Sequence, residues 1–247
     1  MKNICRLLEF SYLLLNITYI LCHKNRIMRR QWEVEMISID EYKANPCRVS
    51  SVPYWKMITI KKPDNITLIH DADYIAEQNY QGVDTLYFRL IHYLENVEPI
   101  NLEKKFTYKN VDTNSVNDLN EVVSIINKSY TDIQVDFNQV LQWTRAEVFD
   151  KNLWIFIIDV EKQKPVALGI AELDKNVREG ALEWIQVIPE YRKRGLGQAI
   201  VNKLLLNMVG KADFVTVSGQ VNNNTNPEKL YRKCGFQGND IWHVILK

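Results

Sequence analysis

The 247-residue sequence is poor in cysteine and nearly balanced in charge, and each shortage excludes a class of protein. The four cysteines are Cys5, Cys22, Cys47 and Cys234; they form no CxxC pair, and no histidine lies near them at metal-ligand spacing. Neither a zinc site nor a disulfide framework is therefore predicted, and we expect no metal, free thiols and a cytoplasmic location. The net charge of +1 offers no overall attraction for nucleic acid or an anionic membrane, so any anion site must be local.

A long hydrophobic run is also missing. The mostly apolar stretch 10–22 is about 13 residues long, short of the ~20 that span a bilayer, so no stable membrane insertion is expected. Residues 1–35 remain open to three interpretations: an export or anchoring segment, a packed or surface helix, or an extraneous extension with the protein beginning near Met36.

Residues 36–100 match no functional motif and predict a small α+β module of unknown role. Ser38 and Glu41 have the spacing of a helix capping box, and 45–53 has the turn residues of a loop. Residues 58–60 and 66–69 have the composition of strands, whereas the apolar spacing over 84–94 favours a helix. We expect this module to help form an acceptor pocket.

A second domain is predicted over residues 104–247. Alternating and helical patterns give the order β-α-α-β-β-β-α-β-α-β, a mixed α/β fold with a largely antiparallel start. The predicted elements are strands at 106–111, 153–158, 166–173, 181–188, 214–217 and 241–245, and helices at 116–129, about 137–149, 198–206 and after Pro227.

The most informative stretch is the turn 192–197, Arg-Lys-Arg-Gly-Leu-Gly, between a predicted strand and a predicted helix. The first amides of a helix have no intrahelical acceptor and lie at the positive end of its dipole. Gly195 and Gly197 allow close approach to a ligand, and Arg192, Lys193 and Arg194 add positive charge. This combination predicts a diphosphate site.

Two segments then resemble the GNAT superfamily of acetyl-CoA-dependent N-acyltransferases. Residues 187–197, VIPEYRKRGLG, are similar to the family's V-x-P-x-x-R lead-in and its Q/R-x-x-G-x-G/A segment. Residues 224–236, NTNPEKLYRKCGF, are similar to its N-x-x-A-x-x-L-Y-x-x-x-G-F segment, with Pro227 where alanine is common. The resemblance covers about residues 104–247 and implies a GNAT-like fold with acetyl-CoA as co-substrate.

The resemblance also implies where coenzyme A would bind. In the family, two strands separate and the pantetheine arm pairs with the exposed main chain of one of them, here at Ile185 and Val187 or their neighbours. The turn amides around Arg194, Gly195 and Gly197 would hold the pyrophosphate. Asn224 occupies the position of a coenzyme-contacting asparagine; the alternative for Asn224 is capping of its own loop.

Direct attack by an amine on a thioester needs a base for the amine and an acid for the leaving thiolate. The resemblance places Tyr231 at the position of the family's frequent general acid; the alternative is a tyrosine that only packs its helix on the sheet. Glu183, two residues before Ile185, is the first choice for the base, and Glu172 on the adjacent strand is the second. Either carboxylate could instead attract a cationic amine or face solvent.

Two functions from different classes follow. The first is an N-acetyltransferase that acts in a ternary complex on a primary amine of a small molecule or peptide. The second is a catalytically silent module that binds acyl-CoA as a sensor or structural partner. A nucleotide-binding protein is disfavoured because no Lys-Ser/Thr pair follows the glycines.

Overall fold

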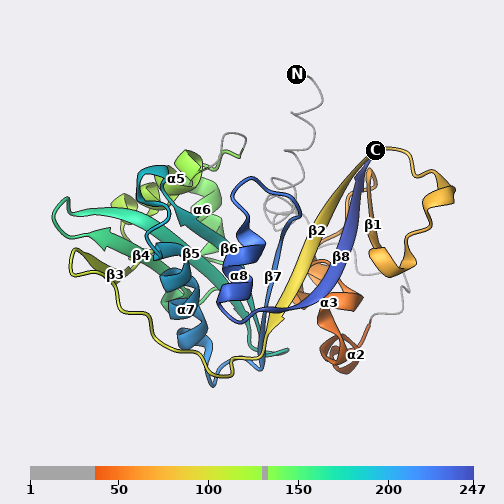
Figure 1. Ribbon diagram of the computed structural model, residues 1–247, viewed down its shortest axis with the longest axis horizontal. Coiled ribbons are helices and arrows are strands. Elements are labelled where there is room, and N and C mark those ends of the chain that lie inside the picture. Colours follow the sequence, from red (N-terminus) through yellow and green to blue (C-terminus); the bar gives the residue numbers. More distant parts are fainter. Residues whose placement is uncertain (1–36, 130–132) are drawn as a thin grey trace. The chain divides into compact units, whose positions relative to one another are not determined.

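A computed structural model describes residues 37–129 and 133–247. The expectations for residues 1–35 lie outside the described residues. The rest of the chain divides into two compact units, each with its own set of strands (Figure 1). Unit 1 holds the described residues up to Leu90 together with Ser218–Asn222 and Gly238–Lys247, and unit 2 holds Ile91–Val217 and Asn223–Gln237.

Unit 1 places three neighbouring strands in the order β1-β8-β2. β1 pairs antiparallel with β8, from Ile66 opposite Leu246 to His70 opposite Trp242. The elements are α2 (Ile39–Ala44), α3 (Pro46–Val49), α4 (Tyr54–Thr59), β1 (Ile66–His70), two 3-10 turns (Asp71–Asp73 and Ala76–Gln78), β2 (Val83–His92) and β8 (Gln237–Leu246).

The capping box at the start of α2 is confirmed, because the Ser38 amide donates to Glu41 Oε2 while the Glu41 amide donates to Ser38 Oγ. Three other predictions for this part of the chain were wrong. The expected loop 45–53 contains helix α3, which starts with Pro46 at its first turn, and residues 58–60 end helix α4 instead of forming a strand.

The third error concerns 84–94, which forms strand β2 and not a helix. Residues 87–92 are buried without alternation, so both faces of the strand are covered. A strand buried on both faces gives a continuous apolar run that periodicity cannot separate from a helix.

Arg89 crosses the interior of unit 1 from the middle of β2 and is only 1% exposed. Its Nη1 donates to the Ser51 carbonyl at 3.3 Å and to Ser218 Oγ at 3.0 Å, and its Nη2 donates to the Tyr42 hydroxyl at 3.1 Å. These bonds tie α2, the 50–53 loop and Ser218 to β2 within this unit.

From Phe106 onward the chain follows the predicted order of elements, except that the last predicted strand, 241–245, is β8 and belongs to unit 1. The strands of unit 2 lie in the order β7-β6-β5-β4-β3; β3, β4, β5 and β6 pair antiparallel, and β6 pairs parallel with β7. The elements are β3 (Phe106–Asn110), α5 (Val116–Ser129), α6 (Phe137–Trp143), a 3-10 turn (Lys151–Leu153), β4 (Trp154–Asp159), β5 (Lys164–Asp174), β6 (Glu179–Val187), a 3-10 turn (Pro189–Tyr191), α7 (Leu196–Met208), β7 (Phe214–Gln220) and α8 (Pro227–Lys233).

Helices cover both faces of these strands (Figure 1). Gly169 of β5 lies directly under α7, since a Cβ there would meet Ile200 and Leu204. On the opposite face, Trp143 of α6 stacks on Trp184 of β6 with ring centroids 5.6 Å apart. Strand β4, between β5 and the edge strand β3, is buried along 154–157, and each such large apolar side chain stabilises the unit by roughly 1.5–3 kcal/mol. Helix α6 ends at Trp143, earlier than the predicted 149.

Candidate active site

The candidate site is built where β6 and β7 separate. Their parallel pairing runs only from Glu179 opposite Phe214 to Leu182 opposite Val217. At the paired end, buried Thr216 donates its hydroxyl to Glu179 Oε1 at 2.7 Å and fixes the two strands together. Beyond Leu182, β6 keeps its partner β5 while no β7 residue in the described chain pairs with it.

The open edge of β6 consists of the main-chain groups of Ile185 and Val187. The Ile188 amide donates to the Val166 carbonyl on β5, and the groups of successive strand residues point to alternate sides. Val187 and Ile185 therefore direct their amide and carbonyl groups away from β5, toward the side where β7 has diverged. This is the arrangement that pairing with a pantetheine arm requires.

An irregularity interrupts β6 at Glu183. Ala171 pairs with Leu182 and the adjacent Ile170 pairs with Trp184, so Glu183 is an extra residue without a register partner. Bulges of this kind bend a strand, re-aim a side chain and are frequent beside active sites. Glu183 is half-buried, and so is Glu172, which pairs in register with Ala181 on the neighbouring strand.

The turn after β6 leaves a series of main-chain donors available. Among the described residues, no oxygen accepts a hydrogen bond from the amides of Arg194, Gly195, Leu196 or Gly197. Gly195 caps α7 in the left-handed conformation with φ of 76°, and no atom lies within 4 Å of the position that its Cβ would take. These donors at a helix N-terminus fit a diphosphate group.

Gly197 has a different environment from Gly195. A Cβ on Gly197 would lie 3.2 Å from Leu230 of α8 and 3.8 Å from Val187 of β6. The absence of a side chain at Gly197 thus lets the first turn of α7 approach α8 and the end of β6.

The three cations of the turn point to different partners. Arg192 donates through Nε to the Val187 carbonyl at 3.1 Å and through Nη2 to the Ser129 carbonyl at 3.5 Å, which ties β6 to the end of α5. Lys193 is exposed and adopts a positive φ of 63°. Arg194 lies 5.4 Å from the ring of Tyr191.

Tyr231 and Asn224 belong to α8 and to the loop before it. Tyr231 is buried, and its ring packs edge-on against Phe236 with centroids 5.8 Å apart. Asn224 is exposed, and the neighbouring Asn226 caps α8 by accepting from the Lys229 amide. Asn226 thus caps the helix, while within the loop Asn223 accepts from the amide and the hydroxyl of Thr225.

His92, which no sequence motif indicates, packs against the residues that directly follow α8. Its Nδ1 accepts from the Leu94 amide at 2.8 Å, and its ring packs against Phe236 at 5.3 Å. Burial lowers the pKa of His92, so its imidazole is neutral at pH 7. Burial also raises the pKa of the nearby Cys234 thiol to about 12, so this cysteine has no thiolate character.

The described residues show neither a metal cluster nor a membrane span. No three His, Cys, Asp or Glu side chains in 37–129 and 133–247 are arranged to hold a metal ion. Within the same residues, no helix has the length and apolar character needed to cross a bilayer.

Comparison with known proteins supports the fold and the family. Residues 150–238 match the model of the acetyltransferase (GNAT) domain. A GCN5-related N-acetyltransferase from Sphaerobacter thermophilus is similar with a TM-score of 0.59 and 14% identity, over 78% of this chain and 64% of that one. A tandem GNAT protein from the clavulanic acid biosynthesis pathway gives a TM-score of 0.52 and 9% identity, over 65% of this chain and 52% of that one.

No curated protein sequence matches the chain. The chain spans just under two thirds of the Sphaerobacter protein and about half of the tandem one. At these identities the two structures establish a shared fold, and the match of 150–238 confirms the family resemblance.

Proposed function

We propose that this chain transfers an acetyl group from acetyl-CoA to a primary amine, in line with the match of residues 150–238 to the model of the acetyltransferase (GNAT) domain. The observation that carries the proposal is the divergence of β6 from β7 directly before a turn of unbonded amides. One element offers a strand edge to a pantetheine arm and the next offers donors to a diphosphate. Both belong to unit 2.

Acetyl-CoA supplies the thioester in this proposal, and the chain supplies binding groups, a base and an acid. Ile185 and Val187 pair with the pantetheine amides through their main chain. The amides of Arg194, Gly195 and Gly197 hold the diphosphate, with Arg192 and Lys193 contributing positive charge and Asn224 contacting the coenzyme. Because the Val187 carbonyl already accepts from Arg192, pairing there requires a rearrangement of this side chain.

Proton transfers are assigned to three side chains. Glu183 takes the proton of the incoming amine, since the bulge sets it apart from the regular strand. Glu172, on the neighbouring strand, attracts the amine cation or replaces Glu183 as base. Tyr231 gives a proton to the departing thiolate; a phenol has an ordinary pKa near 10, which suits donation to a thiolate.

The amine is a small molecule or a peptide, and residues 36–100 are proposed to contribute to its pocket while 104–247 form the acyltransferase domain. Trp55 in α4 is partly exposed and offers a test of this division. Trp55→Ala should raise KM for the amine and leave KM for acetyl-CoA unchanged. An unchanged amine KM across a substrate panel would argue against a role of this segment in acceptor binding.

The experiment that tests the proposed activity is incubation of the full chain with acetyl-CoA and a panel of primary amines, followed by mass spectrometry. An acetyl mass shift on an amine, with release of one CoA per acetylated product, is the expected result. If calorimetry shows that the chain binds the coenzyme but no amine of the panel is acetylated, the proposed transfer activity is wrong.

A silent acyl-CoA-binding module is the second candidate. One observation favours it: Tyr231 is only 8% exposed and its ring packs on Phe236, as expected for a purely structural tyrosine. The same incubation decides between the two candidates, because only an enzyme releases CoA in proportion to acetylated amine.

A further inference from the structure

One end of the strands in unit 2 gathers segments that are far apart in the sequence. β3 begins where β4 ends, with Phe106 opposite Asp159, and Asp159 is also opposite Lys164 at the start of β5. β6 ends at the same edge, with Val187 opposite Ala167, and runs into the turn that carries the proposed diphosphate site. The starts of β3 and β5 therefore lie at the same edge of the strands as that turn.

Four cations converge on two buried aromatic rings at this edge. Lys105 Nζ lies 5.0 Å from the Phe106 ring, whereas Lys162 Nζ, Lys164 Nζ and Arg194 Cζ lie 5.4, 6.0 and 5.4 Å from the Tyr191 ring. The two rings pack edge-on with centroids 6.0 Å apart. We name Lys105, Lys162, Lys164 and Arg194 the basic rim.

The basic rim is neutralised only in part within the described chain, where the interaction with Tyr191 and then the attraction to Asp159 raise the pKa of Lys162. None of its four side chains forms an ion pair among the described residues, and Lys162, Lys164 and Arg194 are exposed. Asp159 lies beneath them, but its carboxylate accepts from the Tyr191 hydroxyl at 2.8 Å and from the amides of Glu161 and Lys162.

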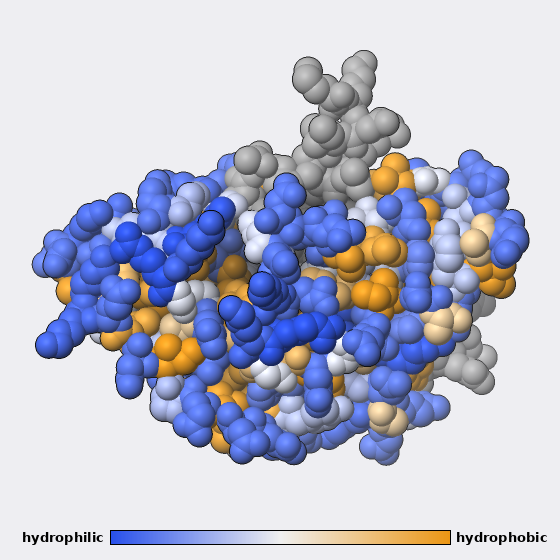
Figure 2. Space-filling model, viewed as in Figure 1, coloured by the Kyte–Doolittle hydropathy of each residue, from blue (hydrophilic) through white to orange (hydrophobic). Residues whose placement is uncertain are grey.

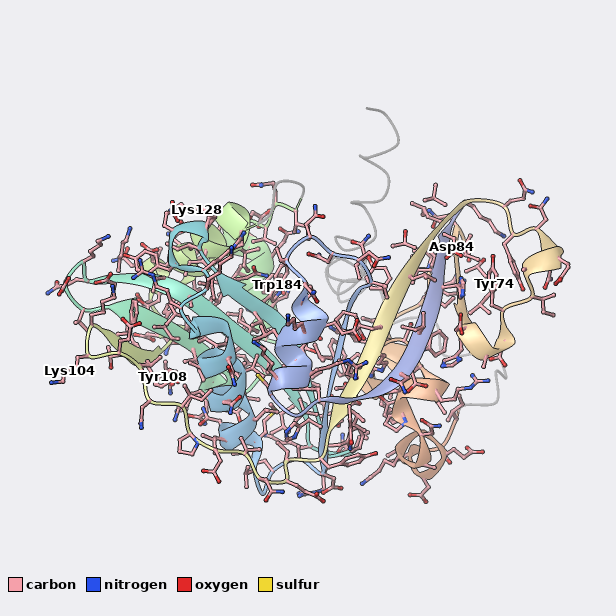
Figure 3. All side chains as sticks on the ribbon, viewed as in Figure 1. Tyr74, Asp84, Lys104, Tyr108, Lys128 and Trp184 are labelled. Carbon is pink, nitrogen blue, oxygen red and sulfur yellow. The ribbon has the colours of Figure 1, made fainter. Side chains whose placement is uncertain are left out.

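Other charges at this edge do not change the sign of the rim. Glu103, Glu161 and Glu190 are exposed and carry negative charge, and Lys104 and Lys193 add two further exposed cations. Figure 3 labels Lys104 beside the start of β3, and Figure 2 shows mostly hydrophilic residues over this end of the strands. Like charges held together repel each other, so an anionic ligand would relieve this repulsion.

The extent of the rim indicates the size of its ligand. It runs along the ends of β3, β4, β5 and β6, and three strand spacings of ~4.8 Å give a width of roughly 15 Å. A single phosphate group is much smaller than this width, so it cannot engage the whole rim. The rings of Phe106 and Tyr191 are about 5% exposed and offer no platform for stacking nucleobases. An acidic protein surface fits the rim better than nucleic acid.

We propose that the basic rim docks an acidic carrier protein that presents the acyl group as a thioester on a phosphopantetheine arm. The inference rests on the proposed function, because Arg194 belongs to both the rim and the diphosphate turn. A phosphopantetheine thioester can come from coenzyme A or from a carrier protein, and the rim selects the carrier. The amine nitrogen forms a bond to the acyl carbon, the carbon–sulfur bond breaks, and the thiol of the arm leaves with the proton that the amine surrenders.

Strand β5 provides a matched pair of variants for the test. Lys164 is the first residue of β5, and Lys175 directly follows its last residue at the opposite end; both are exposed. Lys164→Glu and the control Lys175→Glu make the same charge change at the two ends of one strand, and neither residue belongs to the groups proposed to bind coenzyme A or to transfer protons.

The experiment compares two donors, acetyl-CoA and an acyl carrier protein bearing acetyl-phosphopantetheine, for the full chain and both variants. Lys164→Glu should lower kcat/KM for the carrier roughly tenfold, and the double variant Lys162→Glu/Lys164→Glu should lower it further. Both losses should become smaller as the salt concentration is raised. Acetyl-CoA kinetics should stay within about twofold, and Lys175→Glu should leave both donors within that range. The affinity for the holo-carrier, measured by calorimetry, should fall in the same variants.

Three results would overturn the carrier proposal. If Lys164→Glu lowers kcat/KM for acetyl-CoA as much as for the carrier, and this loss is absent with acetyl-dephospho-CoA as donor, the rim binds the 3′-phosphate of the coenzyme. Tight binding of duplex DNA that Lys164→Glu abolishes would assign it to nucleic acid, and unchanged carrier binding in both rim variants would leave it without a docking role. If neither donor supports transfer to any amine, the proposed activity fails, but the calorimetric comparison of the holo-carrier still decides the docking proposal.

Discussion

A Cβ atom on Gly197 would lie 3.2 Å from Cδ2 of Leu230, so the first turn of α7 is packed closely against α8. Gly195, two residues earlier, faces open space at a φ of 76°. The two glycines of one turn therefore have different purposes. One allows two helices to approach, and the other leaves open space beside amides that donate to no oxygen of the described residues.

The first prediction follows for Gly195. Gly195→Asp should abolish acetyl-CoA binding in calorimetry, because a carboxylate would fill the open space with the same sign of charge as the diphosphate. Gly195→Asn is the matched control: it has a similar shape, carries no charge and tolerates a positive φ better than most residues. It should weaken binding but keep it measurable. Near-normal affinity of the aspartate variant would show that the diphosphate binds elsewhere.

The second prediction concerns Tyr231. Tyr231→Phe keeps the ring that packs on Phe236 and removes only the hydroxyl. If the phenol protonates the leaving thiolate, kcat should fall by about 10²-fold, the lower range for general acid catalysis, with acetyl-CoA affinity unchanged. The thermal midpoint should stay close to that of the parent chain. Full activity in this variant would assign Tyr231 to packing alone.

The strands and helices from Phe106 onward could be predicted from the sequence because each has a clear period or cap. The alternation in 106–110, the apolar stripe of α5 and Pro227 at the first turn of α8 are local signals. β2 was mistaken for a helix because tertiary contacts bury both of its faces, and these contacts are not visible in a local pattern.

The turn of the candidate site has a clear signal in the sequence, and its surroundings have less. The glycines, the cations and the strand–turn–helix order predict a diphosphate position at this turn. The bulge at Glu183 depends on the registers of two strand pairs, and alternation within β6 alone gives no sign of it. The basic rim was missed for a similar reason, since Lys105, Lys162 and Arg194 meet only after β3, β4, β5 and β6 are paired.

The third prediction separates the two candidate bases. Glu183→Gln should lower kcat/KM for the amine by about 10²-fold at neutral pH, because the amide cannot accept the proton. Glu172→Gln is the matched control on the adjacent strand and should have a smaller effect. Acetyl-CoA affinity should be unchanged in both, as measured by calorimetry. A larger loss for Glu172→Gln would reverse the assignment, and normal kinetics in both would remove the carboxylates from the proton transfers.

The fourth prediction concerns the pH dependence of stability through His92. Burial lowers the folded-state pKa of this imidazole from its usual value near 6.5, despite opposing contributions from the Cys234 carbonyl and from Glu95. The unfolded chain therefore binds a proton at a higher pH than the folded chain. The stability associated with neutral His92 is present above about pH 6.5 and is lost as the pH falls from there through the folded pKa.

His92→Asn provides the comparison, because the Asn side-chain oxygen can accept from the Leu94 amide as His92 Nδ1 does. Urea unfolding of both chains between pH 7.5 and 5 measures the difference in their free energies of unfolding. The advantage of the parent chain should shrink as the pH falls, since only the parent has a histidine to protonate at this position. An advantage that stays constant or grows toward low pH would contradict a neutral, buried His92 at the end of α8.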